Sequence, residues 1–188
     1  MALLPILEIL LANIIWGFGF VATIWALESL SWSQIFLYRF LIAGVTGFLI
    51  YLIFSRKFFK KYIKVSFLPA IFLCAEVGFQ VMSLQSTKAT EGGFLFVTYV
   101  IMVPVIEFHL FKKYLPPKQF IWILLGVIGS YLMANEGSIS LGRGELTMLL
   151  SALGASAHVI TIDRINKEEL SSFYFNVFQL LWGILFSL

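Results

Sequence analysis

Apolar residues form long uninterrupted runs along this chain, and short polar stretches separate one run from the next. Most of the runs approach the roughly 20 residues that an α-helix needs to cross about 30 Å of hydrocarbon. The runs are continuous, whereas the strands of a membrane barrel alternate apolar and polar residues. The pattern predicts an all-α, polytopic membrane helix bundle with about seven transmembrane helices: Ile6–Leu27, Ser33–Phe54, Val65–Leu84, Gly92–Phe111, Phe120–Ala134, Glu145–Ile165 and Ser171–Leu188.

The composition supports a membrane protein and excludes several soluble classes. Of the 188 residues, 60% are hydrophobic and 12% are charged, whereas a soluble domain carries about 25% charged residues. A soluble enzyme, a nucleic-acid-binding protein and a disordered tail are therefore poor fits. GFGFVA matches the dinucleotide fingerprint G-x-G-x-x-A, but it lies within a predicted membrane span, where that motif has no strand and turn to act through. No H-E-x-x-H, P-loop or C-x-x-C motif occurs, so neither a metal nor another cofactor is expected.

Basic residues lie on alternate loops, and this asymmetry predicts the orientation in the membrane. One side holds Lys88 and Arg143, and the other holds ten: Arg56, Lys57, Lys60, Lys61, Lys64, Lys112, Lys113, Lys118, Arg164 and Lys167. Loops rich in Lys and Arg stay in the cytoplasm. We therefore expect a multi-pass protein of the cell (inner) membrane with a cytoplasmic N-terminus. The lipid bilayer is its expected partner, and nucleic acid is not.

Short motifs recur in an order that resembles a known family. The first span contains Trp16 and Gly17 in IIWGFGFV, and the second contains Arg39 and Phe40 in IFLYRFLIAG. LQSTKATEGGFL precedes the fourth span, which carries Pro104, and the fifth contains the Gly-rich ILLGVIGSYLMA. In this order, the motifs resemble the EamA-like branch of the drug/metabolite transporter (DMT) superfamily.

The resemblance implies ten helices in two inverted five-helix repeats that together move a small metabolite or drug. Residues 1–136 resemble the first repeat, and residues 137–188 resemble the beginning of a second, incomplete one. A displacement of 139 residues pairs Gly44 with Gly183, which agrees weakly with a repeat. Because both repeats line the family's central cavity, a homodimer is one way to close it. Where the family has a Glu after the fourth helix, this chain has Lys113, which puts that Glu's ion pair in doubt.

Polar residues inside the membrane are the candidate substrate-binding residues, because burying them in lipid is costly. At about 1.5 Å per residue, Arg39 and Glu76 lie roughly 9 and 13 Å from the outer boundary. We therefore expect a direct Arg39–Glu76 ion pair with bidentate geometry. Gln80 shares the helix face of Glu76, because it follows four residues later. The full set is Trp16, Arg39, Glu76, Gln80, Tyr99 and His158.

A structural interpretation of the same residues stays open. The Arg39–Glu76 pair can fix the packing of two helices, and His158 can be a hydrogen-bonded packing residue. If Glu76 instead exchanges protons, it would couple transport to a proton gradient. Glu107 and His109 lie near the inner boundary, where snorkelling to the headgroups is expected.

Small residues and one proline predict where the helices meet and bend. Gly17, Gly19, Gly44 and Gly47 are expected to allow close approach or bending, and Ala152 and Ser156 form a small-xxx-small pair. Pro104 is expected to kink the fourth span.

The resemblance favours secondary active efflux by alternating access. The chain is not expected to be an enzyme, because no nucleophile and base lie at one depth. The alternatives are a membrane-embedded enzyme and a non-transporting accessory or assembly protein.

Overall fold

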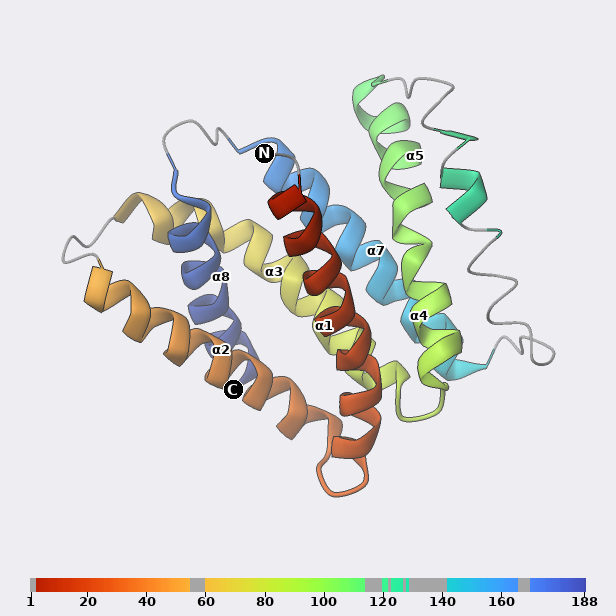
Figure 1. Ribbon diagram of the computed structural model, residues 1–188, viewed down its shortest axis with the longest axis horizontal. Coiled ribbons are helices and arrows are strands. Elements are labelled where there is room, and N and C mark those ends of the chain that lie inside the picture. The colour runs from red at the N-terminus through yellow and green to blue at the C-terminus, as the bar shows by residue number, and fades with distance from the viewer. Residues whose placement is uncertain are drawn as a thin grey trace.

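The computed structural model describes residues 3–54, 60–113, 120–121, 123–126, 128, 142–165 and 170–188 (Figure 1). Within these ranges the chain forms helices and no strand, which confirms the all-α bundle. The helices are α1 (Leu3–Leu27), α2 (Trp32–Phe54), α3 (Lys60–Ser83), α4 (Ala89–Val97), α5 (Tyr99–Phe111), α7 (Arg143–Asp163) and α8 (Ser172–Ser187).

Five stretches are long and apolar enough to cross a membrane among the residues that the structure describes. They are α1, α2, α3, the combined α4–α5 stretch Ala89–Phe111, and α7. The first four predicted spans and the sixth are therefore confirmed. The seventh corresponds to α8, whose 16 residues extend about 24 Å. Most of the predicted span Phe120–Ala134 lies outside the described residues, and its described residues are helical.

The bundle is organised around α3, which runs beside α7 through the middle of the molecule (Figure 1). Helix α8 packs against both α2 and α3, while α4 and α5 pack against α7. By contrast, α1 packs mainly against α4 and α2. An 18-residue apolar stretch of α1 is 6% buried, whereas the corresponding stretch of α7 is 44% buried. The bundle therefore covers much less of α1 than of α7.

The α3–α7 contact depends on small side chains. The buried face of α7 includes Ser151, Ala152, Ala155 and Ser156. A Cβ atom added to Gly154 would lie 2.9 Å from the backbone nitrogen of Glu76. The Ser151 hydroxyl donates a hydrogen bond of 2.7 Å to the Glu76 carbonyl oxygen. Small residues thus bring the two backbones together, as the small-xxx-small pair predicts.

Glycines also make the α2–α8 contact. A Cβ atom on Gly44 would lie 2.8 Å from Ile184 Cδ1, and one on Gly183 would overlap the ring of Phe40. Gly44 and Gly183 are the positions that the 139-residue displacement pairs, and they face each other's helices. Gly17 and Gly19 on α1 differ, because a Cβ atom there would meet nothing within 4 Å. Within the part of the chain that the structure describes, the predicted close approach therefore occurs on α2 and does not occur on α1.

The fourth span is divided at Thr98, six residues before Pro104. The Thr98 hydroxyl donates to the Leu95 carbonyl at 2.5 Å, and the Thr98 N–H donates to the same oxygen at 3.2 Å. This three-residue spacing tightens one turn between α4 and α5. Pro104 itself lies inside α5, so the interruption falls on the tightened turn rather than on the proline.

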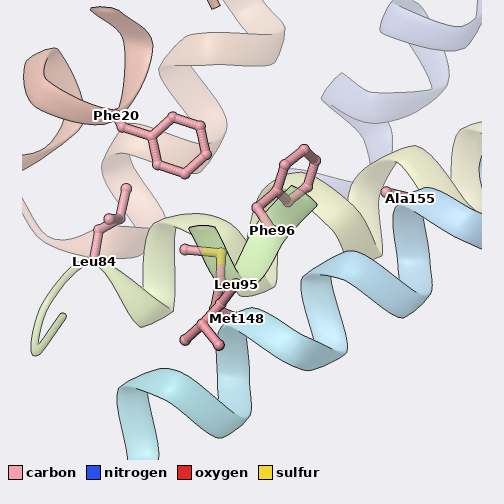
Figure 2. Packing of buried hydrophobic residues seen from close by; sticks show 6 residues of the cluster. All are labelled: Phe20, Leu84, Leu95, Phe96, Met148 and Ala155. Atoms are coloured by element: carbon pink, nitrogen blue, oxygen red, sulfur yellow. The ribbon is translucent and has the colours of Figure 1, made fainter. Parts of the chain in front are cut away.

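An apolar cluster ties α1 to the rest of the bundle. Figure 2 shows Phe20 from α1 facing Phe96 from α4, with Met148 and Ala155 of α7 close by. The Phe20 and Phe96 rings meet edge to face with centroids 5.9 Å apart. Such aromatic contacts contribute about 0.5–1.5 kcal/mol beyond buried area, so this cluster is the main anchor of α1.

Ion pairs close the end of the bundle at which α5 and α7 finish. Lys112 adopts a left-handed conformation with φ 56°, and the next N–H, of Lys113, bonds back to the Glu107 carbonyl at 3.3 Å. The Lys112 N–H also bonds to the Phe108 carbonyl at 3.0 Å, which is the bond of an αL helix cap. The Lys113 ammonium lies near Glu107 Oε1 (2.9 Å) and Asp163 Oδ2 (3.4 Å). Glu107 is 7% exposed, so the prediction that it snorkels to the headgroups is wrong.

Replacing Lys113 with methionine should lower thermal stability slightly, in a way that depends on pH. Hydrogen bonds to Glu107 and then to Asp163 raise the pKa of Lys113 above its ordinary 10.5. Because the pKa of Lys113 is raised in the folded state, its ion pairs contribute their full stability below pH 10.5. This contribution is lost as the pH rises through the raised pKa. The unfolding midpoints of wild type and Lys113→Met, measured across pH 8–12, should therefore converge at the alkaline end. Lys112→Met is the matched control and should show no such convergence.

Candidate functional site

A polar network surrounds Glu76, a side chain on α3 that is only 4% exposed. Its Oε2 atom lies 3.3 Å from Nδ1 of His158 on α7. One turn further along α3, Gln80 Oε1 accepts a 3.0 Å hydrogen bond from Nη1 of Arg39 on α2. Three helices thus contribute polar side chains to one buried region.

The predicted direct Arg39–Glu76 ion pair is wrong. Arg39 donates to Gln80, and the partner of Glu76 is His158. The face of α7 that carries small side chains lies against the α3 backbone at Glu76. His158 therefore comes within reach of the Glu76 carboxylate. The Glu76 charge still acts on Arg39 through space. The two residues therefore belong to one electrostatic group without touching.

Tyr99 borders the same group. It begins α5, and the Glu76 charge also acts on its hydroxyl. Ser156 on α7 donates a 3.5 Å hydrogen bond to the Tyr99 carbonyl oxygen. This bond links α5 to α7 beside the network.

Gln179 on α8 belongs to the network, and the sequence analysis did not select it. Its Oε1 lies 2.8 Å from His158 Nε2, and the residue is 2% exposed. The available signal was a polar residue within the apolar run FNVFQLLWG. That signal becomes specific only when α8 is packed against α3 and its Gln179 reaches His158, and periodicity cannot place one helix against another.

A pocket of about 260 Å³ lies beside Gln179, between the end of α7 and the beginning of α8. Its lining includes Ile165, Leu170, Ser172 and Asn176. Asn176 is exposed, and Gln179 lies one turn deeper on the same helix. The pocket therefore leads from the surface toward the His158 end of the network.

Trp16 lies apart from this network, in a second pocket of about 380 Å³ between α1 and α4. The lining includes Asn13, Trp16 and Phe20 from α1, and Thr90 and Phe94 from α4. The Trp16 ring lies 6.1 Å from Phe96, which lies 5.3 Å from Tyr99, measured between ring centroids. The structure therefore gathers five of the six predicted site residues and joins Trp16 to them only through aromatic rings.

The network is suited to handling charge and hydrogen bonds. It contains a guanidinium, a carboxylate, an imidazole and two carboxamides. Among the described residues, no three His, Cys, Asp or Glu side chains gather in a way that could hold a metal ion. The groups present can bind a polar solute or exchange a proton.

Comparisons with known proteins agree with this architecture. The profile of the EamA-like transporter family matches residues 3–135. The chain is 30% identical over 162 residues to a protein of Archaeoglobus fulgidus described as an "Uncharacterized transporter". That alignment covers 86% of this chain and 49% of the relative, so the chain spans about half the relative's length. No solved structure matches the chain.

Proposed function

Because this chain belongs to the EamA-like transporter family, we propose that it moves a small metabolite or drug-like solute by secondary active efflux and alternating access. The family and the multi-pass helical bundle support membrane transport. The observation that carries the proposal is the buried Arg39–Gln80 and Glu76–His158 network at the centre of apolar helices. Polar groups are expensive inside a membrane, so they mark functional positions.

The pocket between α1 and α4 is the proposed solute-binding site. Its volume of about 380 Å³ falls in the range of small-molecule sites, roughly 300–1,000 Å³. Three aromatic side chains (Trp16, Phe20 and Phe94) and two polar ones (Asn13 and Thr90) line it. This lining suits a compact solute with an aromatic ring and a polar group.

Orientation follows from the basic residues. Lys60, Lys113 and Arg164 all lie at the same end of the bundle, where α3 begins and α5 and α7 end. Placing this end in the cytoplasm of a cell (inner) membrane satisfies the preference of Lys and Arg for that side. The pocket beside Gln179 then opens toward the cytoplasm, and Arg39 lies nearer the outside.

Residues 137–188 are proposed to begin a second repeat. Helix α7 begins at Arg143 and α8 follows it, as α1 and α2 begin the first repeat. Gly44 and Gly183, equivalent under the 139-residue displacement, both lie in the α2–α8 contact. Helix α7 is covered largely by α3, whereas α1, its proposed equivalent in the first repeat, stays mostly exposed. A homodimer is the proposed way for this chain to cover α1. A monomeric mass in mild detergent would contradict the dimer.

Counterflow into liposomes tests transport without assuming a coupling ion. Four radiolabelled probes share one ring and differ in charge: indole, tryptamine, tryptophan and indole-3-acetate. We expect saturable exchange of at least one probe by the full chain. Exchange no faster than in protein-free vesicles for all four would contradict the proposed solute class, and it is the result that an accessory protein predicts.

Trp16→Ala should raise the half-saturating concentration of that probe about tenfold, which corresponds to about 1.4 kcal/mol. The reason is the loss of one aromatic partner, typically worth about 0.5–1.5 kcal/mol beyond the area that it buries. Trp25→Ala is the matched control, because Trp25 is also exposed on α1 and lies outside the pocket. Equal effects of the two substitutions would place the solute elsewhere.

A further inference from the structure

We propose that Glu76, His158 and Gln179 form a proton-binding site, in which one exchangeable proton is held between the Glu76 carboxylate and the His158 imidazole. The coupling of this proton to solute movement rests on the proposed function. The site itself rests on the geometry of the three side chains, and it can be tested without a solute.

The two imidazole nitrogens have partners of different chemistry. His158 Nε2 lies 2.8 Å from Gln179 Oε1, which is an acceptor, so Nε2 carries a hydrogen in this arrangement. His158 Nδ1 lies 3.3 Å from Glu76 Oε2. A bare Nδ1 would place a lone pair against an ionised carboxylate. With Nε2–H donating to Gln179, this pairing needs a second ring proton on Nδ1, which donates to Oε2, so the proton-bound ring is an imidazolium.

Loss of that proton leaves neutral His158 and ionised Glu76. The carboxylate then requires the remaining N–H at Nδ1, and Nε2 becomes an acceptor. Gln179 can serve both states, because a carboxamide has an acceptor oxygen at one end and two N–H donors at the other. Rotation of its amide by half a turn replaces the accepted hydrogen bond with a donated one. Gln179 is therefore a positioning residue that keeps the imidazole in place with or without the proton.

Nearby charges balance the charge of Glu76 when the site holds no proton. Arg39 on α2 and the Tyr99 hydroxyl on α5 are the titratable groups on which the Glu76 charge acts from neighbouring helices. On α3 itself, Gln80 is neutral and bonds to Arg39, and Cys74 packs in an apolar cluster with Ile35 and Phe40. When the proton leaves, Arg39 and Glu76 carry opposite charges. The network is then neutral, and it gains one positive charge when the proton binds.

The path of the proton from the surface to His158 is short. The pocket of about 260 Å³ reaches Gln179 from the surface near Ser172 and Asn176. The His158 side chain is 15% exposed and that of Glu76 is 6% exposed. The imidazole is thus the more accessible member of the pair, and Glu76 is the member nearer to Arg39 on the far side. A proton entering through the pocket reaches His158 first.

Nitrogen-15 spectroscopy of labelled histidine in lipid nanodiscs tests the site directly. The chain contains two histidines, so His109→Gln leaves His158 as the only imidazole. We expect neutral His158 to carry its proton on Nδ1, facing Glu76. Glu76→Gln should allow the Nε2–H form to appear, because the carboxylate no longer demands a donor. A neutral wild-type imidazole protonated at Nε2 would overturn the proposal.

Gln179→Glu tests the positioning role, because a carboxylate only accepts. We expect both His158 nitrogens to stay protonated across pH values at which the wild-type ring is neutral. Asn176→Asp is the matched control, since it makes the same chemical change one turn away in the same pocket, and it should leave the His158 spectrum unchanged. Identical spectra for wild type and Gln179→Glu would also overturn the proposal.

A transport measurement separates the proton site from the proposed function. With the probe that shows wild-type counterflow, accumulation driven by a pH gradient is divided by counterflow in the same vesicle preparation. We expect Gln179→Glu to lower this ratio at least tenfold, and an unchanged ratio would contradict coupling. If no probe shows counterflow, the proposed solute class fails, while the spectra still decide whether the proton site exists.

Discussion

Replacing Gly154 with valine should lower the free energy of unfolding by about 3 kcal/mol, at the upper end of typical overpacking costs. A Cβ atom at this position would lie 2.9 Å from the Glu76 nitrogen and 3.1 Å from its Cα. These are backbone atoms and cannot rotate away, so α3 and α7 must separate. The two extra methyl groups of valine enlarge the required shift. Reversible unfolding in mixed detergent micelles measures the loss.

The matched control for this prediction is Gly17→Val on α1. A Cβ atom at Gly17 meets nothing within 4 Å, so we expect a change within about 0.5 kcal/mol. Equal losses of stability at Gly154 and Gly17 would show that the cost comes from placing valine in a helix and not from the α3–α7 contact. Because Gly154 lies against Glu76, separation of the helices should also weaken the Glu76–His158 contact. Gly154→Val should therefore alter the His158 nitrogen spectrum, and Gly17→Val should not.

Arg39→Met should destabilise the protein by about 3 kcal/mol, at the lower end of the cost of removing one partner from a buried charged group. The substitution keeps an unbranched side chain and removes the donor to Gln80 at 3.0 Å. It also removes the positive charge that acts on Glu76. The remaining Glu76 carboxylate would then be buried with only His158 to balance its charge.

A double-mutant cycle separates the two causes of this loss. If charge balance dominates, combining Arg39→Met with Glu76→Gln should cost less than the sum of the single losses, by at least about 1 kcal/mol. Combining Arg39→Met with Gln80→Met isolates the direct hydrogen bond, for which a coupling of about 1–3 kcal/mol is expected because the donor is charged. Additive losses in both cycles would mean that the three side chains do not act as one group.

Several features of the site were predictable because they depend on local composition. Arg39, Glu76 and Gln80 stand out as polar residues in apolar runs, and the four-residue spacing of Glu76 and Gln80 places them on one helix face. The assignment of partners was not predictable. Depth along each helix placed Arg39 and Glu76 at similar levels, but the lateral position of α7 decided that His158 pairs with Glu76. Gln179 entered the network for a similar reason, because α8 packs against α3 and brings Gln179 within reach of His158.

The sequence by itself determined that this protein is a bundle of membrane-crossing helices, because uninterrupted apolar runs of sufficient length permit no other backbone structure in lipid. It also predicts the direction of the helices, through the uneven distribution of Lys and Arg, and it determined the identity of most polar residues within them. Only the tertiary structure decided which of these residues meet. Contacts between helices depend on rotation about each axis and on how closely two backbones approach. At Gly154 and Gly183 that approach is permitted by the absence of a side chain, and it places His158 beside Glu76 and α8 beside α2.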